Sequence, residues 1–329
     1  METPVSVLLE GVGGFMRSRV ILTASELDLF TFLDRKPANA ESTARNLGLN
    51  RKATARLLDC LVTLGLLEKK DRTYQTAVPG RLLSSDHPQT LLPMALHLKH
   101  QWDRWSHLTE RVKQGGGSER SGLAEFNGED QKNFIGAMHV AGRELAREIA
   151  GAYDTRSFKR LLDIGGGSGS YTTAFLERNP SLTAVIFDLE EVIQLAEERI
   201  RSEGLQERVE LVGGDFYADE LPRGCDFALL SAIIHQNSPE ENFQLFGKIR
   251  RVLQPGGVLL IRDYMMDESR TTPPGGALFA LNMLVSTRSG DTYTLAEVTE
   301  TLERAGFVEV KQVRRGARMD DLLEARVPN

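Results

Sequence analysis

A glycine-rich turn preceded by an aspartate is the part of this sequence best suited to binding a ligand. Residues 163–169 read Asp-Ile-Gly-Gly-Gly-Ser-Gly and follow a short apolar run. Glycines allow a sharp backbone turn and let a ligand approach more closely than a Cβ would permit. We therefore expect Gly165 and Gly167 to line a cofactor site, although a glycine-rich turn by itself is also compatible with turn geometry alone.

Acidic and aromatic residues at the ends of the next predicted strands extend this site. Asp188 follows Asp163 by 25 positions, where a carboxylate can accept hydrogen bonds from both hydroxyls of a ribose. Asp215 and Phe216 follow the third strand, where the aspartate can meet an adenine amino group and the phenylalanine can cover the ring. The predicted cofactor-binding residues are Asp163, Gly165, Gly167, Asp188, Leu189, Asp215, Phe216 and Ser231.

Two kinds of cofactor compete for such a turn. A dinucleotide fingerprint requires Gly-x-Gly-x-x-Gly, and counted from Gly165 its third glycine is replaced by Ser170. An acidic Asp163 facing the turn suits a ligand with an ammonium group and repels a pyrophosphate. The sulfonium and amino groups of S-adenosylmethionine have this cationic character. We predict S-adenosylmethionine as the cofactor, with a dinucleotide as the alternative.

The elements that must position these residues alternate between strand and helix from about residue 160 onward. Apolar runs predict strands at 160–164, 184–187, 209–212, 227–231 and 258–262. Such alternation is typical of a parallel sheet with crossover helices. Two closing strands, 308–313 and 322–326, have no helical pattern between them, so we expect them to pair antiparallel at one edge.

The first part of the chain reads differently, because helical patterns dominate up to about residue 85. Predicted helices at 43–49 and 53–64 are followed by strands at 66–68 and 74–76, which is the order of a winged helix-turn-helix. A long helical stretch at 88–112 leads to a glycine-rich joint at 114–118. We therefore predict two domains, residues 1–115 and 116–329.

Composition excludes several classes of protein. The chain has 329 residues and a net charge of −6, which argues against nucleic acid as the main partner. No apolar run approaches the ~20 residues of a membrane-spanning helix, and no signal peptide is apparent. Two cysteines, Cys60 and Cys225, provide neither a disulfide framework nor a metal site. We expect a cytoplasmic protein without a metal ion.

The chain resembles a known family, the small-molecule O-methyltransferases related to caffeic acid and acetylserotonin O-methyltransferases, with bacterial polyketide-tailoring members. The resemblance covers nearly the whole chain. It is carried by residues 161–169, 185–189, 214–216, 233–235, 253–257 and 305–307, together with the winged-helix part. It implies a Rossmann-like, seven-stranded α/β sheet and an N-terminal helical domain that forms a homodimer, in which each partner helps to wall the other's substrate pocket.

The resemblance also implies a general base, since a histidine just after the fourth strand has that role in the family. The matching residue is His235, followed by Gln236 and Asn237 where the family usually has His-Asp-Trp or His-His-Trp. Of the six histidines, His235 is the one that this interpretation places at the carboxyl edge of the sheet. The family holds the base with two carboxylates. One matches Asp263, which is shorter than the usual Glu, and the other is replaced by Thr292.

A substrate pocket follows from the same resemblance, because the family has substrate-contacting residues on two helices. The matching positions on one helix are Phe279, Asn282 and Met283, and those on the other are Phe134 and Met138. Each could instead be an ordinary core residue. Together they suggest an apolar pocket for a flat acceptor.

The predicted reaction is methyl transfer to a hydroxyl of a small, aromatic or polyketide-like acceptor. Decarboxylation or hydroxylation with the same cofactor, and methylation at nitrogen or carbon, are alternatives. A DNA-binding regulator, suggested by the winged helix with Arg51, Lys52 and Arg56, is disfavoured by the acidic composition. A nicotinamide dehydrogenase would require the dinucleotide alternative.

Overall fold

The computed structural model describes residues 4–115 and 128–329 and divides into two compact units, Met1–Asp103 and Arg104–Asn329. The glycine-rich joint predicted at 114–118 lies mostly outside the described residues, and Gly115 is the last residue before the gap. The long helical stretch predicted at 88–112 is two helices, α6 (Leu92–Trp105) and α7 (Leu108–Gln114), separated at residues 106–107.

The N-terminal unit contains the two helices and the hairpin that the sequence predicts. Its elements are α1 (Pro4–Glu26), α2 (Leu29–Arg35), β1 (Ala38–Asn39), α3 (Ala40–Leu47), α4 (Arg51–Thr63), β2 (Leu67–Lys70), β3 (Thr73–Thr76) and α5 (Val78–Arg81). The side chains of Asn39 and Asn50 cap α3 and α4 by accepting bonds from backbone amides of the first turn. Phe30, Leu58 and Leu61 are fully buried and form the centre of a small core.

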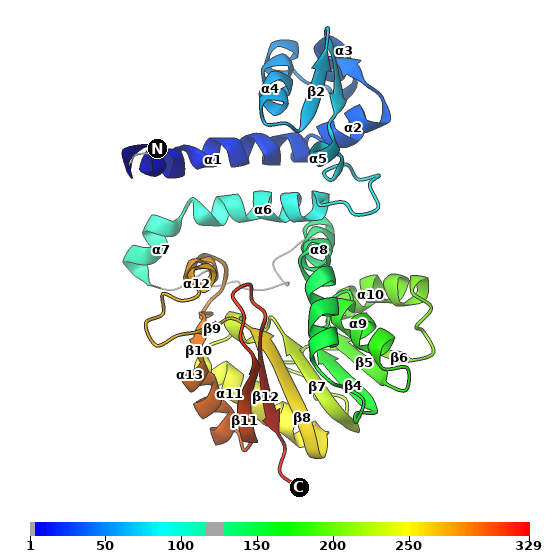
Figure 1. Cartoon of the computed structure of the whole chain (residues 1–329), viewed down its shortest axis with the longest axis vertical. Helices are drawn as coiled ribbons and strands as arrows, with labels where there is room; N and C mark the ends of the chain where they lie inside the picture. The colour runs from blue at the N-terminus through cyan, green and yellow to red at the C-terminus, as the bar shows by residue number, and fades with distance from the viewer. Residues whose placement is uncertain (1–3, 116–127) are drawn as a thin grey trace. The chain divides into compact units, whose positions relative to one another are not determined.

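The C-terminal unit is built on a seven-stranded sheet of order β11-β12-β8-β7-β4-β5-β6 (Figure 1). Its strands are β4 (Arg160–Ile164), β5 (Thr183–Asp188), β6 (Val209–Gly213), β7 (Cys225–Ser231), β8 (Leu253–Asp263), β11 (Val308–Arg314) and β12 (Asp321–Arg326). The five predicted strands are confirmed as a parallel set, and the two closing strands pair antiparallel at the β8 edge, as predicted.

Helices cover both faces of this sheet (Figure 1). One core includes residues of α8 (Gly128–Ala152), α9 (Ser170–Arg178) and α10 (Glu190–Ser202), and the other includes residues of α11 (Pro239–Val252) and α13 (Leu295–Arg304). Successive residues of a strand point to opposite faces, so Leu161 packs in the first core and Leu162 in the second. Because both faces are buried, the strands are almost continuously apolar.

Short elements complete the unit at the carboxyl edge of the parallel strands. They are a 3₁₀ turn, η2 (Ile234–Gln236), the strands β9 (Met265–Met266) and β10 (Tyr293–Thr294), and α12 (Pro274–Ser286). A capping box of Ser238 and Glu241 opens α11, and a second, of Thr294 and Glu297, opens α13. The first box fixes the start of α11 directly after the η2 turn, which carries His235.

Candidate functional site: a glycine-rich turn and a histidine at the carboxyl edge of the sheet

The glycine-rich turn joins β4 to α9 and needs glycine at several positions. Gly165, Gly167 and Gly169 have φ values of 68°, 56° and 75°, in the left-handed region that glycine adopts at little cost. A Cβ on Gly165 would lie 2.6 Å from Ile233 Cδ1 and 3.7 Å from Phe216 Cε1. The turn is therefore packed closely against the segments that follow β6 and β7.

Asp188, at the end of β5, lies beside this turn. Its carboxylate accepts hydrogen bonds from the backbone amides of Gly167 and Leu189, each at 2.8 Å. The side chain is almost completely buried, and burial raises the pKa of Asp188 to about 6. These two bonds orient the carboxylate at the carboxyl edge, where a ribose would meet it.

Asp163 lies beneath the turn. Its carboxylate accepts a bond of 2.7 Å from Thr172 Oγ1, and a Cβ on Gly166 would lie 2.9 Å from its Cγ. Asp163 is 1% exposed; burial, with a smaller contribution from Asp188, raises its pKa to about 6. The structure thus brings two buried carboxylates to one turn, which suits a cationic ligand and disfavours a pyrophosphate.

The loop after β6 carries the predicted adenine-facing residues. Asp215 Oδ1 accepts a 2.8 Å bond from the amide of Tyr217, and the rings of Phe216 and Tyr217 lie 4.4 Å apart. Lys248 donates to the carbonyl oxygens of Phe216, Tyr217 and Asp219, at 2.8–3.0 Å. The loop is held from α11, and it presents the Phe216 ring near Gly165.

His235 and Asp263 form a direct pair at the same edge of the sheet. His235 Nδ1 lies 3.0 Å and 2.9 Å from the two carboxylate oxygens of Asp263. Asp263 is 1% exposed and also accepts a bond from the amide of Tyr264. With Nδ1 held by a carboxylate, the proton-accepting position of a neutral imidazole is Nε2.

Thr292, which replaces the second carboxylate of the family, has a structural contact instead. Its hydroxyl is buried and donates at 3.4 Å to the carbonyl oxygen of Gly276 in α12. Among the described residues, no hydrogen bond joins Thr292 to His235. The charge support of the histidine therefore comes from Asp263.

Asn237 is a site residue that the sequence did not reveal. It is completely buried, and its Oδ1 accepts from the Tyr217 hydroxyl at 2.5 Å while its Nδ2 donates to Asn242 Oδ1 at 2.9 Å. Its carbonyl oxygen accepts from the hydroxyl of Tyr293. Asn242 in turn donates to the carbonyl oxygen of Ile234. This network ties the η2 turn to the loop after β6, to α11 and to β10.

The predicted substrate residues are distributed over two helices. In α12, the Phe279 ring meets the His235 ring edge-on at 4.8 Å, and Met283 is buried. Asn282 Oδ1 accepts a bond of 3.0 Å from Trp105 Nε1. On α8, the other two predicted substrate residues differ in exposure: Phe134 is half-buried and Met138 is 38% exposed.

Tyr264, directly after Asp263, is another residue near His235 that was not predicted from the sequence. Its ring lies 5.6 Å from that of Phe279, so the two rings extend the aromatic surface that begins at His235. A Cβ on Gly275 would lie 3.0 Å from the Tyr264 hydroxyl, which shows how closely α12 begins against it. The sequence offered no signal for Tyr264 beyond its position next to Asp263.

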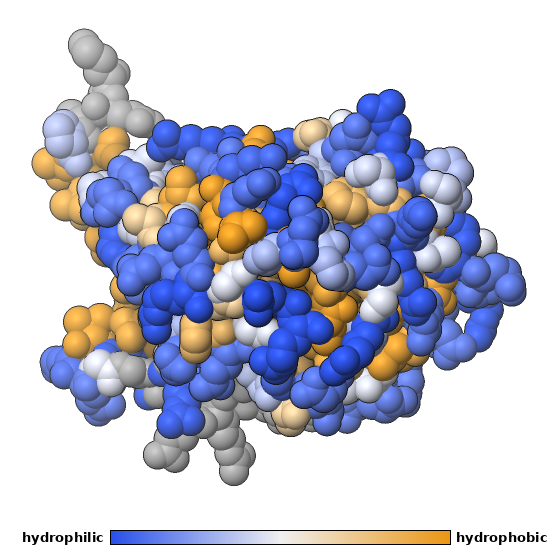
Figure 2. Space-filling model, turned by 90° about the horizontal axis from the view of Figure 1, so that it is seen from below, coloured by the Kyte–Doolittle hydropathy of each residue, from blue (hydrophilic) through white to orange (hydrophobic). Residues whose placement is uncertain are grey.

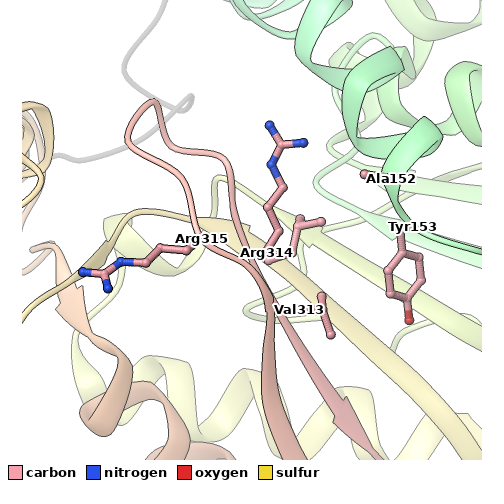
Figure 3. A pocket seen from close by; sticks show the side chains of 6 residues that line it. Ala152, Tyr153, Val313, Arg314 and Arg315 are labelled. Atoms are coloured by element: carbon pink, nitrogen blue, oxygen red, sulfur yellow. The ribbon is translucent and has the colours of Figure 1, made fainter.

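A separate cavity of about 370 Å³ lies between the end of α8 and the antiparallel edge of the sheet (Figure 3). It is lined by Ala152, Tyr153, Val313, Arg314, Arg315 and Leu322, none of which is a predicted site residue. Within residues 4–115 and 128–329, no cluster of three or more potential metal ligands is found. The same ranges contain no helix of the length and hydrophobicity required to cross a bilayer.

The parallel sheet, the glycine-rich turn and the two buried carboxylates define an α/β enzyme unit that binds an adenosine-type cofactor at the carboxyl edge. The donor set fits S-adenosylmethionine, since glycines clear the approach and Asp163 and Asp188 favour positive charge.

Comparison with known proteins supports the same conclusion. Residues 105–308 match the O-methyltransferase domain family, and residues 9–86 match the O-methyltransferase dimerisation domain family. The chain is 31% identical over 315 residues to the 3-hydroxy-5-methyl-1-naphthoate 3-O-methyltransferase of Streptomyces sahachiroi, covering 94% of this chain and 91% of that protein. It is 32% identical over 311 residues to the tetracenomycin polyketide synthesis 8-O-methyl transferase TcmO of Streptomyces glaucescens, covering 92% and 91%.

Among solved structures, PigF with S-adenosylhomocysteine (SAH) is similar over the whole of both chains, with a TM-score of 0.88 and 25% identity. The chain therefore belongs to the O-methyltransferase family that carries an N-terminal dimerisation domain. It is an S-adenosylmethionine-dependent O-methyltransferase.

The raised pKa values of Asp188 and Asp163 predict a pH dependence of cofactor binding. Ribose hydroxyls and an ammonium group favour ionised carboxylates, so binding of SAH lowers both pKa values from about 6 and releases protons. Calorimetric affinity should rise from about pH 5 to about pH 7.5 and then level off, by about tenfold for each carboxylate that must ionise. The Asp188→Asn protein should bind about tenfold more weakly at pH 7.5 and show a smaller pH dependence. A flat profile for the unmodified protein would contradict this assignment.

The Asn237 network predicts a stability effect. Asn237→Leu keeps the approximate size of the side chain but leaves the Tyr217 hydroxyl and Asn242 Oδ1 without their partner. We expect the free energy of unfolding of the C-terminal unit to fall by about 2–4 kcal/mol, since each buried unpaired group costs about 1–3 kcal/mol. Ser238→Ala, which removes the neighbouring helix cap, is the control and should cost about 1 kcal/mol. Denaturant titration followed by circular dichroism measures both, and a loss for Asn237→Leu no greater than that for Ser238→Ala would contradict the expected contribution of the network.

Proposed function

We propose that the chain transfers the methyl group of S-adenosylmethionine to a phenolic hydroxyl of a small aromatic or polyketide-like acceptor, with His235 as the general base. The observation that carries this proposal is the pair of His235 and Asp263, 2.9 Å apart, at the edge of the sheet that also holds the glycine-rich turn. The two Streptomyces relatives described above act on a hydroxynaphthoate and in polyketide synthesis, which supports an acceptor of this class.

The bound cofactor supplies an electrophilic methyl group on a sulfonium. The chain's own residues then have three tasks: to orient the acceptor, to exclude water and to remove one proton. In this proposal Nε2 of His235 takes the hydroxyl proton while Asp263 holds Nδ1 and stabilises the imidazolium. Orientation of the acceptor oxygen supplies most of the remaining acceleration. No step of this proposal uses a metal ion.

The acceptor surface in this proposal begins at the aromatic side chains beside the base. Phe279 and Tyr264 provide neighbouring aromatic rings, tilted by 48° to each other, and Met283 is buried on the same helix as Phe279. Phe134 and Met138 are proposed as the facing wall, from α8. Flat aromatic acceptors match such a surface because they bury large apolar area at small entropic cost.

The cofactor residues are assigned by the same reasoning. Asp188 is proposed to accept from the ribose hydroxyls, and Asp215 and Phe216 to bind the adenine. Gly165, Gly167, Leu189 and Ser231 complete the lining, with Asp163 providing negative charge from below. The support is the convergence of these residues, from four neighbouring strands, at one edge.

We further propose that the chain is a homodimer held by residues 1–115, with residues 116–329 as the methyltransferase domain. The dimerisation-domain match, residues 9–86, lies within the first segment, and the methyltransferase-domain match begins at residue 105. The dimer is also supported by α1, which exposes several large apolar side chains, namely Val5, Val7, Leu8, Leu9, Val12, Phe15 and Met16. On the face of the molecule in Figure 2, by contrast, apolar residues form small groups among hydrophilic ones.

We also propose a cytoplasmic location. Both cysteines are free, which suits the reducing cytoplasm.

The His235 assignment is tested by His235→Ala with a hydroxynaphthoate acceptor. We expect kcat to fall by about a hundredfold or more while the affinity for SAH is unchanged. Asp263→Asn should have a smaller effect, and His87→Ala, in the other unit, should have none.

Mass spectrometry of the product separates methylation from decarboxylation or hydroxylation of the acceptor. If His235→Ala retains most of its activity, the base assignment is wrong and proximity alone drives transfer.

The dimer is tested by sedimentation equilibrium at micromolar concentration. The mass should be about twice the 36.5 kDa of one chain. Leu8→Glu together with Phe15→Glu should shift the mass toward the monomer, because a charge on each exposed apolar side chain opposes its burial. Val308→Glu, at a valine of β11 that is 43% exposed, is the control and should leave the mass unchanged. A monomeric unmodified protein would rule out the proposal.

A further inference from the structure

A buried arginine at the carboxyl edge of the sheet has neutral partners. Arg262, near the end of β8, is 7% exposed. Its Nε donates to Ser231 Oγ at 2.8 Å, and its Nη1 donates to the carbonyl oxygen of Met319 at 2.9 Å. Its guanidinium carbon lies 5.0 Å from the centre of the Tyr171 ring. In the described part of the chain, no carboxylate forms an ion pair with it.

Such an arrangement is costly without a further partner. Arginine keeps its proton under all physiological conditions, so Arg262 cannot avoid the cost of burial by becoming neutral. A buried charge without a counter-charge is destabilising by several kcal/mol, and hydrogen bonds to neutral groups compensate only part of this. A ligand with an anionic group would complete the site.

Tyr171, in the first turn of α9, provides an independent indication. It is 9% exposed, and its hydroxyl is buried without a hydrogen-bond partner among the described residues. An unpaired buried hydroxyl costs about 1–3 kcal/mol. Burial raises the pKa of Tyr171, and the Arg262 guanidinium and the Ser231 hydroxyl oppose this rise. Arg262 contacts both Ser231 and the Tyr171 ring, so the three polar groups lie together.

These groups adjoin the glycine-rich turn. Ser231 is the last residue of β7, the strand that pairs with β4, and Tyr171 precedes Thr172, which holds Asp163. A Cβ on Gly142 would lie 3.5 Å from the Tyr171 ring, so α8 covers the site from the other side. Arg262 and Tyr171 therefore lie on the α9 side of the cofactor turn, next to the end of β4.

Two other cations near the turn, Lys248 and Arg199, have partners of their own, while Arg199 Nε is buried without one. Lys248 donates to three carbonyl oxygens on the adenine-facing loop. Arg199 contacts His139 Nε2 at 2.8 Å and forms an ion pair with Glu203. Asp163 and Asp188, the buried acids of the site, repel a carboxylate.

We propose that Arg262 and Tyr171 bind the carboxylate of the amino-acid end of the cofactor, while Asp163 attracts its ammonium group. This inference rests on the proposed function, since it specifies a subsite for S-adenosylmethionine. A guanidinium and a phenolic hydroxyl are well suited to a carboxylate, which accepts several charge-assisted bonds. The opposite charges on the two sides of the turn then match the zwitterionic end of the ligand.

Calorimetry with three ligands tests the subsite. S-adenosylmethionine carries the carboxylate, decarboxylated S-adenosylmethionine lacks it, and 5′-methylthioadenosine lacks the whole amino-acid end. For Arg262→Met we expect the affinity for S-adenosylmethionine to fall about ten- to a hundredfold, and the affinities for the other two ligands to change by less than about threefold. Tyr171→Phe should show the same selectivity with a loss of about fivefold to tenfold. Arg262→Lys should recover part of the affinity lost in Arg262→Met.

Equal losses for S-adenosylmethionine and its decarboxylated form would overturn the proposal, because Arg262 would then act on the fold and not on the carboxylate. Circular dichroism of each variant checks folding, and Tyr171→Phe keeps the test decisive if Arg262→Met does not fold. Failure of the unmodified protein to bind S-adenosylmethionine or methylthioadenosine would instead reject the proposed function, so the two failures are distinguishable.

Discussion

The close contact between Gly165 and Ile233 constrains both halves of the site. A side chain at position 165 would collide with Ile233, which lies two residues before His235. The glycine-rich turn and the η2 turn that carries His235 are therefore packed directly on each other. Any displacement of one is transmitted to the other, because packed interiors deform little. The positive φ of Ala232, 58°, belongs to the same tight exit from β7.

Charge around this contact is arranged unevenly. Asp163 and Asp188 are buried on the side of β4 and β5, and Arg262 is buried on the side of β8. Each of these groups is held by neutral donors or acceptors, so their charges are available to a ligand. Burial strengthens their interactions with a bound zwitterion, since the local dielectric constant is low. The cost of keeping them unpaired is consistent with a binding site, where stability is commonly sacrificed for recognition.

The support of His235 differs from the family pattern but is still substantial. Asp263 reaches Nδ1 directly despite being shorter than the glutamate usual at its position. Asn237, which occupies a place where the family usually has tryptophan, replaces packing with hydrogen bonds to Tyr217 and Asn242. The loop after α12 also lies against this turn, since a Cβ on Gly290 would lie 2.4 Å from the carbonyl oxygen of His235. Buried networks of this kind fix one arrangement of the backbone.

The amino-acid sequence by itself determined the strands, the parallel direction of the first five and the antiparallel closing pair, because these depend on local periodicity. The order of the strands in the sheet came from the tertiary structure. It also predicted Asp163, Asp188, His235 and Asp263 as site residues, because they lie at strand ends or match family motifs. Only the tertiary structure showed the roles of Asn237 and Tyr264 and the pairing of Arg262 with Tyr171 and Ser231. Those contacts join segments far apart in the chain, and local sequence patterns do not predict which distant side chains will meet at the end of a strand.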